Sequence, residues 1–150
     1  MNASDTIVEE ITINGTAERI FEALTDPAQR IKWWGGEGRF QMTQMESDLR
    51  PGGKWMMRGI GYGKPVSVLG EYRRIERPHL LVFTWLPDWE EDATESLVCF
   101  ELEEKEGVTT VRLTHSGLIS EASRDHHKGW ARILAWLQAY MATANPSSIP

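Results

Sequence analysis

The hydrophobic pattern begins with a two-residue period. Over residues 6–13, the apolar residues that share one side of this period are Ile7, Ile11 and Ile13, as in a half-buried strand. After Gly15 the period becomes helical, with apolar residues at Ala17, Ile20, Phe21 and Leu24. Thr16 is the predicted N-cap of this helix. The pattern therefore predicts a strand followed by an amphipathic helix.

A second short helix is predicted to begin after Asp26. Asp26 is its N-cap, Pro27 occupies the first helical position, and Gln29 lies where a capping box needs a partner. Proline is tolerated there because the first helical N–H has no intrahelical acceptor. The pattern stops after Trp34, at two consecutive glycines. Two short helices thus follow the first strand.

Six further segments are predicted strands separated by short turns; they follow a period of two, except that residues 79–86 are apolar on both faces. Their ranges are 39–45, 54–60, 66–76, 79–86, 96–104 and 108–116. This arrangement predicts an antiparallel meander, since parallel strands would need long crossover connections. The residues that share one side of each strand are Phe40, Met42, Trp55, Met57, Val66, Val68, Gly70, Tyr72, Leu81, Phe83, Trp85, Val98, Phe100, Leu102, Val111, Leu113 and His115.

Residues 120–142 predict a C-terminal helix with a wide apolar side. At about 100° per residue, its large apolar side chains span an arc of roughly 160°, which exceeds the stripe of about 100° that a surface helix needs. They are Trp130, Ile133, Leu134, Trp136, Leu137, Tyr140 and Met141. Only a concave surface can cover such a helix. The strands can form one, because antiparallel sheets twist and because Gly59 and Gly70 let the sheet bend.

The predicted fold class is α+β, with a curved antiparallel sheet wrapped around a long C-terminal helix and two short helices after the first strand. Residues 1–143 are expected to form one domain and residues 144–150 a flexible tail. A curved sheet and a straight helix do not fit perfectly. A cavity lined by apolar and aromatic side chains can therefore remain between them, of the kind that holds small ligands.

Several side chains on these surfaces are candidates for the wall of such a cavity, although for each of them taken singly a place in a solid core is the default interpretation. Methionine fills irregular spaces, and tryptophan and tyrosine each add one polar group. The candidate ligand-binding residues are Trp34, Phe40, Met42, Trp55, Met57, Tyr72, Phe83, Trp85, His115 and Trp130.

Composition narrows the class of partner. Sixteen basic and 22 acidic residues give a formal charge of −6, which argues against nucleic acid or an anionic membrane surface. No apolar run reaches the length of a membrane span. Cys99 is the only cysteine and is expected to be a small buried hydrophobic residue. With no disulfide and no secretory signal at the N-terminus, the sequence predicts a cytoplasmic protein.

Two histidines are candidate catalytic groups. His115 shares a strand face with Leu113, and His126 falls inside the apolar arc of the C-terminal helix. If strand and helix face each other, these imidazoles could transfer protons to or from a ligand. The alternative is a hydrogen-bonded core histidine and a solvated histidine at the helix start. The sequence contains no metal-ligand spacing and no phosphate-binding or hydrolase motif, so neither metal nor cofactor is expected.

Several stretches together resemble the SRPBCC superfamily, whose domains have the START or birch-pollen-allergen-like helix-grip fold, and most closely its activator of heat-shock-protein-90 ATPase homologue branch. They are residues 18–27, 33–34, 48–55, 66–76, 80–85, 108–118 and 129–137. The resemblance implies one helix-grip domain with a hydrophobic cavity between sheet and helix. It also implies that lipids, hormones or polyketide intermediates are plausible ligand classes, and it identifies no catalytic motif that could be transferred.

Three functions follow as hypotheses. The first is binding of a small hydrophobic or amphipathic molecule. The second is an enzyme of the polyketide cyclase or hydratase type that uses His115. The third is a co-chaperone-like interaction module, linked to the stress response, with a chaperone or a second copy of the chain as partner. Chaperone-activating members of the branch carry an additional N-terminal domain, for which we expect no room in 150 residues.

Overall fold

The computed structural model describes residues 6–36, 40–61, 63–88, 94–118 and 129–144. In chain order the elements are β1 (Ile7–Asn14), α1 (Ala17–Thr25), α2 (Pro27–Trp33), β2 (Gly35–Gly36), β3 (Phe40–Ser47), β4 (Lys54–Gly61), β5 (Lys64–Glu76), β6 (Leu80–Pro87), β7 (Ser96–Lys105), β8 (Val108–Ser116) and α4 (Trp130–Ala144). The predicted first strand, the two short helices, the six later strands and a C-terminal helix are all present.

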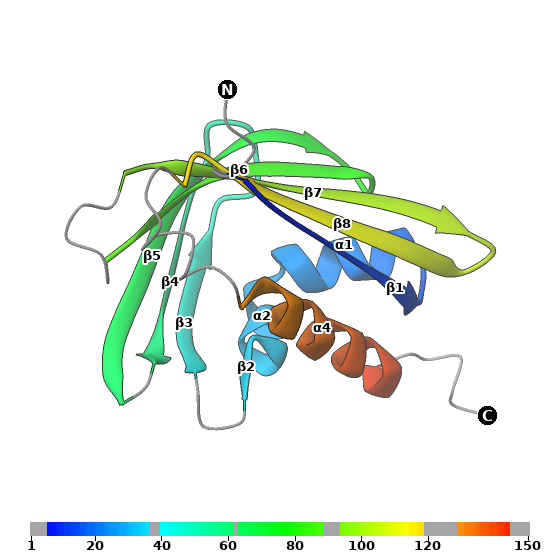
Figure 1. Ribbon diagram of the computed structural model, residues 1–150, viewed down its shortest axis with the longest axis horizontal. Coiled ribbons are helices and arrows are strands. Elements are labelled where there is room, and N and C mark those ends of the chain that lie inside the picture. Colours follow the sequence, from blue (N-terminus) through cyan, green and yellow to red (C-terminus); the bar gives the residue numbers. More distant parts are fainter. Residues whose placement is uncertain (1–5, 37–39, 62, 89–93, 119–128, 145–150) are drawn as a thin grey trace.

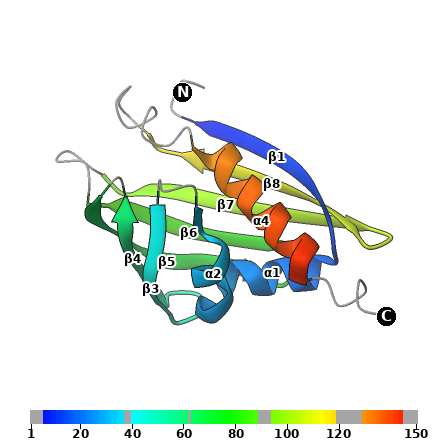
Figure 2. The same cartoon turned by 90° about the horizontal axis from the view of Figure 1, so that it is seen from below.

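Within the described residues, eight strands form one sheet in the order β1-β8-β7-β6-β5-β4-β3-β2, and every neighbouring pair is antiparallel. The sheet arches over the helices, and Figures 1 and 2 show α1, α2 and α4 on its concave side. This is the predicted α+β helix-grip arrangement. The sequence did not predict β2, which is only two residues long and consists of glycine.

The helix caps follow the sequence with one difference. Thr16 accepts a 3.2 Å hydrogen bond from the backbone N–H of Arg19, and Asp26 accepts one of 3.1 Å from Ala28. The expected capping box at Gln29 does not form. Its amide instead donates to the carboxylates of Glu22 and Asp26, because the backbone N–H of Asp26 already donates to the carbonyl of Glu22 in the last turn of α1.

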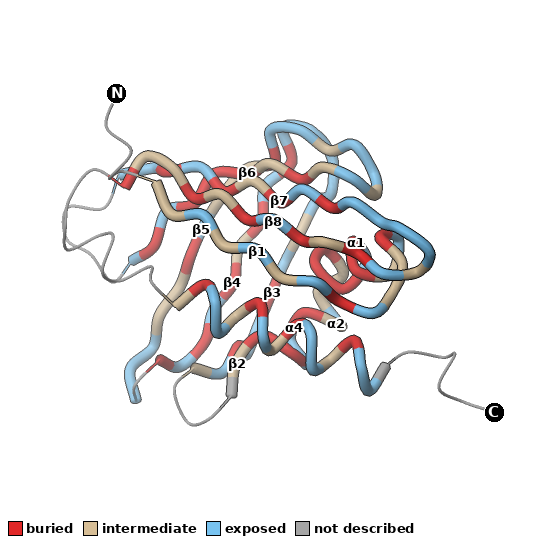
Figure 3. Tube along the Cα trace, turned by 45° about the vertical axis from the view of Figure 1, so that its right-hand side comes forward, coloured by how far each residue is buried: buried red, intermediate tan, exposed pale blue. Residues whose placement is uncertain are grey.

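The residues predicted for the inward side of the sheet are buried or half-buried. Figure 3 shows the corresponding alternation of buried and exposed stretches along the strands. A register shift between Met42 and Gln44 interrupts β3. It brings Met45 instead of Gln44 to the buried side, as expected when a bulge inserts one extra residue. A strict two-residue period could not have indicated this change.

Gly70 illustrates why a glycine faces inward on β5. It pairs with Trp55 of β4, and the indole of Trp55 lies against it. A Cβ atom at position 70 would overlap the Trp55 ring and the backbone carbonyl of Thr84. The absence of a side chain therefore lets a large aromatic ring lie close to the sheet.

Helix α4 buries four side chains spaced by three or four residues, Trp130, Leu134, Leu137 and Met141. It packs mainly along β1, and Gln138 donates a 2.8 Å hydrogen bond to the carbonyl of Thr12 there. The helix reaches Ala144, slightly beyond the expected end. Residues 119–128, which include most of the expected N-terminal part of this helix and His126, lie outside the described residues.

None of the described helices is both long enough and apolar enough to cross a membrane.

Candidate ligand-binding site

The interior between the sheet and α4 contains a connected group of aromatic rings centred on Trp85. The ring centroid of Trp85 lies 5.3 Å from that of Trp130, 5.8 Å from that of Trp55 and 6.3 Å from that of Trp34. The imidazole of His115 also packs against Trp85, at a centroid distance of 5.8 Å. Elements that are far apart in the sequence thus contribute to one cluster.

Phe83 extends this cluster toward the middle of the sheet. Its ring contacts those of Trp55, Tyr72 and Phe100 at centroid distances of 5.3, 6.2 and 6.1 Å. The candidate residues that the structure buries in the core are Trp34, Met42, Trp55, Met57, Tyr72, Phe83, Trp85, His115 and Trp130, whereas Phe40 is half-buried. Most of the predicted cavity wall therefore consists of side chains that pack against one another.

His115 is fully buried and its two ring nitrogens are both engaged. The indole N–H of Trp130 donates a 3.0 Å hydrogen bond to Nδ1. On the other side, Nε2 and the hydroxyl of Ser96 are 2.7 Å apart. Because Nδ1 accepts, the ring proton is on Nε2 and is donated to the Ser96 oxygen. The Ser96 hydroxyl in turn donates to the carbonyl of Trp85 at 3.3 Å.

This arrangement defines what His115 can do chemically. A general base must offer a lone pair to a reacting group, and the only lone pair of this neutral imidazole is used by Trp130. The observed hydrogen bonds are those of the core histidine that the sequence left open as an alternative. The second candidate, His126, lies outside the described residues.

The most unusual buried group is Arg30 of α2, which sequence reasoning did not single out. Its side chain is 3% exposed, and Nη1 donates a 3.2 Å hydrogen bond to the carbonyl of Leu24. Among the described residues, Nε and Nη2 have no hydrogen-bond partner. The available signal was its spacing: Arg30 precedes the buried Trp33 by three residues and so shares its helix face.

Aromatic rings surround the Arg30 guanidinium. Its central carbon lies 4.3 Å from the centroid of Trp34 and 5.8 Å from that of Trp55, which are cation–π distances. Burial lowers the pKa of Arg30 to about 10, so the group remains a cation at neutral pH. The indole N–H of Trp55 also has no partner among the described residues. Among the described residues, Arg30 and Trp55 thus hold three of the four buried donor atoms that lack a partner, and Trp136 holds the fourth.

Tyr72 borders the same region from β5. Its hydroxyl is 2.6 Å from that of Ser47. Burial raises the pKa of Tyr72, while the Ser47 hydrogen bond and the nearby Arg30 charge act in the opposite direction. Tyr72 is therefore a neutral group at physiological pH and does not balance the charge of Arg30.

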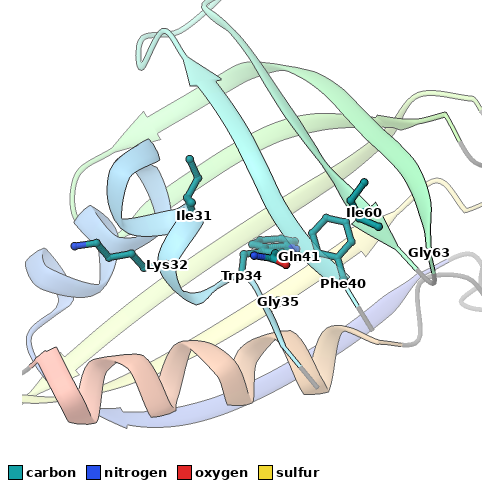
Figure 4. A pocket seen from close by; sticks show the side chains of 8 residues that line it. All are labelled: Ile31, Lys32, Trp34, Gly35, Phe40, Gln41, Ile60 and Gly63. Carbon is teal, nitrogen blue, oxygen red and sulfur yellow. The ribbon is translucent and has the colours of Figure 1, made fainter. Parts of the chain in front are cut away.

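A pocket of about 330 Å³ opens between the end of α2 and the strands β3 and β4. Its lining residues are Ile31, Lys32, Trp34, Gly35, Phe40, Gln41, Ile60 and Gly63. Figure 4 shows Trp34, Gln41, Phe40 and Ile60 close together, with Lys32 extending away from Phe40. The volume is at the lower end of the range for small-molecule sites.

Two of the predicted ligand-binding residues, Trp34 and Phe40, line this pocket. The sequence pattern did not indicate Gln41 and Ile60, because they alternate with the inward residues and were expected to face solvent. They line the pocket together with Ile31 and Lys32 of α2, because α2 packs beside β3. Trp34 is the residue that belongs both to this pocket and to the interior cluster.

The described residues contain no group of three or more His, Cys, Asp or Glu side chains that could hold a metal ion. The site itself presents aromatic surfaces, methionine side chains, a few hydrogen-bond donors and one buried cation.

Comparison with known proteins identifies the family of the chain and solved structures with a similar fold. Residues 14–142 match the family described as Activator of Hsp90 ATPase homolog 1-like protein. No curated protein matches the chain. A solved structure from Rhodobacter sphaeroides is 22% identical, with a TM-score of 0.81 over 97% of this chain and 95% of that one. The similarity to an AHSA1-like protein from Aeromonas hydrophila is 23% identity, with a TM-score of 0.76 over 93% of each chain.

A third similar structure is a protein of the dynemicin biosynthetic locus. It is 20% identical with a TM-score of 0.74, and the match covers 95% of this chain but 49% of that one. At such identities the three structures establish the likeness of the fold.

Proposed function

Because the chain belongs to the family of Activator of Hsp90 ATPase homolog 1-like proteins, we propose that it is a binding domain for a small hydrophobic or amphipathic molecule. The observation that carries this proposal is the position of Trp34, whose indole both lines the pocket and contacts the interior rings of Trp85 and Trp130. A ligand held in the pocket would thus meet the outermost ring of the interior cluster.

The composition of the pocket supports an apolar ligand. Trp34, Phe40 and Ile60 supply apolar surface, while Gln41 offers a hydrogen-bonding amide, which is the combination typical of small-molecule sites. Deeper in the domain the buried Met42, Met45 and Met57 are unbranched side chains that can rearrange around a guest. The proposal also includes the deeper lining that an enlarged cavity would expose. These predicted wall residues are Met42, Trp55, Met57, Tyr72, Phe83, Trp85, His115 and Trp130.

The test is titration with phenylnaphthylamine, an uncharged probe that fluoresces in apolar surroundings. Binding should increase its fluorescence and raise the melting temperature, since a ligand that binds only the folded state stabilises it. Ile60→Trp fills the pocket from an exposed position and should weaken binding about tenfold or more. Leu69→Trp is the matched control, because Leu69 is also exposed on a strand but does not line the pocket.

Two results would contradict the proposal. One is the absence of any fluorescence change or thermal shift with the wild-type protein. The other is equal loss of binding in Ile60→Trp and Leu69→Trp, which would place the probe elsewhere on the sheet.

A protein contact is the alternative function, and exposed leucines favour it. Leu69 and Leu86 are paired across β5 and β6, and Leu97 lies on the neighbouring strand β7. A chaperone or a second copy of the chain could cover this outer face of the sheet. Sedimentation of the purified protein, compared with that of Leu69→Lys, tests self-association. A concentration-independent monomer in both proteins would argue against it.

A further inference from the structure

The unpaired cation in the interior points to the chemical class of the ligand. We infer that the protein binds an organic acid whose carboxylate is received by Arg30, with the apolar part of the acid in the pocket. This inference rests on the proposed ligand-binding function and makes it more specific.

The first argument is the hydrogen bonding of the guanidinium. A buried charge is stable when it is paired and hydrogen-bonded, yet no carboxylate of the described residues pairs with Arg30, and Nε and Nη2 lack partners. These two nitrogens form one edge of the planar guanidinium. A carboxylate can accept from both at once, with its two oxygens side by side.

The second argument is the arrangement of donors. The guanidinium carbon lies 5.8 Å from the ring centroid of Trp55, whose indole N–H is likewise without a partner among the described residues. The two free donors of the Arg30 guanidinium are complementary to an anion and not to a cation or an apolar group. One guanidinium balances one negative charge, which matches a carboxylate better than a doubly charged phosphate.

The third argument is the relation of Arg30 to the pocket. The guanidinium stacks on Trp34 at 4.3 Å, and Trp34 lines the pocket. Trp34 therefore contacts both the pocket and the cation. Rotation of this side chain would let an acid group reach Arg30 while its hydrocarbon part remains against Phe40 and Ile60, so the expected ligand is amphipathic with one acidic end.

Lys32 is the rival group for recognition of the acid. It is an exposed cation that also lines the pocket. An ion pair at Lys32 would be solvated and screened by salt, whereas one at Arg30 would be shielded from salt by the surrounding rings. The two possibilities therefore differ in salt dependence as well as in the residue responsible.

The experiment compares decanoate with decanol, which share a hydrocarbon chain and differ in the acid group, by titration calorimetry at low and high salt. We expect wild-type protein to prefer decanoate by about tenfold or more, as for a hydrogen bond to a charged group, at both salt concentrations. Arg30→Met should abolish the preference, and Arg30→Lys should reduce it because lysine cannot present two parallel donors. Lys32→Met removes the rival cation and should retain the preference if Arg30 receives the acid.

Folding of each variant is checked by its melting temperature. Replacing an unpaired buried cation with an apolar residue of similar length is commonly neutral or stabilising, so Arg30→Met is expected to fold. If Arg30→Met does not fold, the role of Arg30 is still tested by the preference of the wild-type protein for decanoate over decanol and by its reduction in Arg30→Lys.

The outcomes separate this inference from the function on which it rests. Equal affinity for decanoate and decanol in the wild-type protein overturns the role of Arg30 and leaves apolar ligand binding intact. A preference that survives Arg30→Met, or that disappears in Lys32→Met or at high salt, assigns the acid to Lys32 and also overturns it. If neither compound nor phenylnaphthylamine binds, the inference and the proposed function both fail.

Discussion

The indole N–H of Trp130 donates a 3.0 Å hydrogen bond to Nδ1 of His115, which links the first residue of α4 to the end of β8. Both side chains are buried, and their rings are also in edge contact at 5.8 Å. This single bond fixes the tautomer of His115 and, through it, the hydrogen bond to Ser96. His115 thus holds helix and sheet together at the point where a catalytic role was considered.

Replacing His115 should therefore reduce stability. His115→Leu leaves the Trp130 N–H and the Ser96 hydroxyl without their partner, and we expect the free energy of unfolding to fall by about 3 kcal/mol. Urea unfolding measures this change. His79→Leu is the control, because that imidazole is exposed, and should change stability by less than about 1 kcal/mol. Equal losses in the two variants would argue against a structural role for His115.

Gly70 should not tolerate a side chain. In Gly70→Ala the new Cβ overlaps the Trp55 ring and the carbonyl of Thr84, so we expect a loss of about 2 kcal/mol in the free energy of unfolding. Gly129→Ala provides a matched comparison, since the nearest atom there is the end of a flexible arginine side chain at 3.9 Å. Its stability should stay within about 0.5 kcal/mol of wild type. Similar stability losses in Gly70→Ala and Gly129→Ala would show that the packing of the Trp55 ring does not require a glycine at position 70.

Tyr72 should give the stability a dependence on alkaline pH. Burial is the main cause of its raised pKa, so in the folded protein the phenol keeps its proton above the ordinary value of 10.0. The unfolded chain releases this proton first, and the stability that Tyr72 contributes is present below pH 10.0 and lost as the pH rises through the raised pKa. The stability difference between wild type and Tyr72→Phe should accordingly shrink above pH 10.0. Urea unfolding at several pH values measures it, and a constant difference would contradict the burial effect.

Cys99 should react slowly with thiol reagents. The structure corrects the expectation of a buried residue: Cys99 lies on the outer side of β7 and is partly exposed. Desolvation, followed by the charge of Glu101, nevertheless raises the pKa of the thiol, which leaves little reactive thiolate at neutral pH. Iodoacetamide labelling should be about tenfold slower or more than in the urea-unfolded chain. The same rate in both states would contradict this prediction.

Predicted site residues differ in how well local pattern could identify them. Trp34 lies where the second helical pattern ends at two glycines, and Phe40 was found because it shares a strand face with Met42. Gln41 and Ile60 were not found, since their place beside the pocket depends on the path of α2 past the sheet edge. Arg30 was missed for a related reason: a charged residue in a short helix is normally solvated. Its spacing from Trp33 places both residues on one helix face, but the burial of that face depends on aromatic rings from other elements.

The sequence by itself determined the order of the elements, the inward side of nearly every strand and the apolar side of the C-terminal helix. These properties are local, because a period of 2 or 3.6 residues fixes which side chains share a face whatever lies opposite. The tertiary structure alone decided the register shift at Met42, the burial of Arg30 between Trp34 and Trp55, and the pairing of His115 with Trp130. Each of these depends on segments far apart in the chain, whose contacts are set by packing and not by the period of either segment.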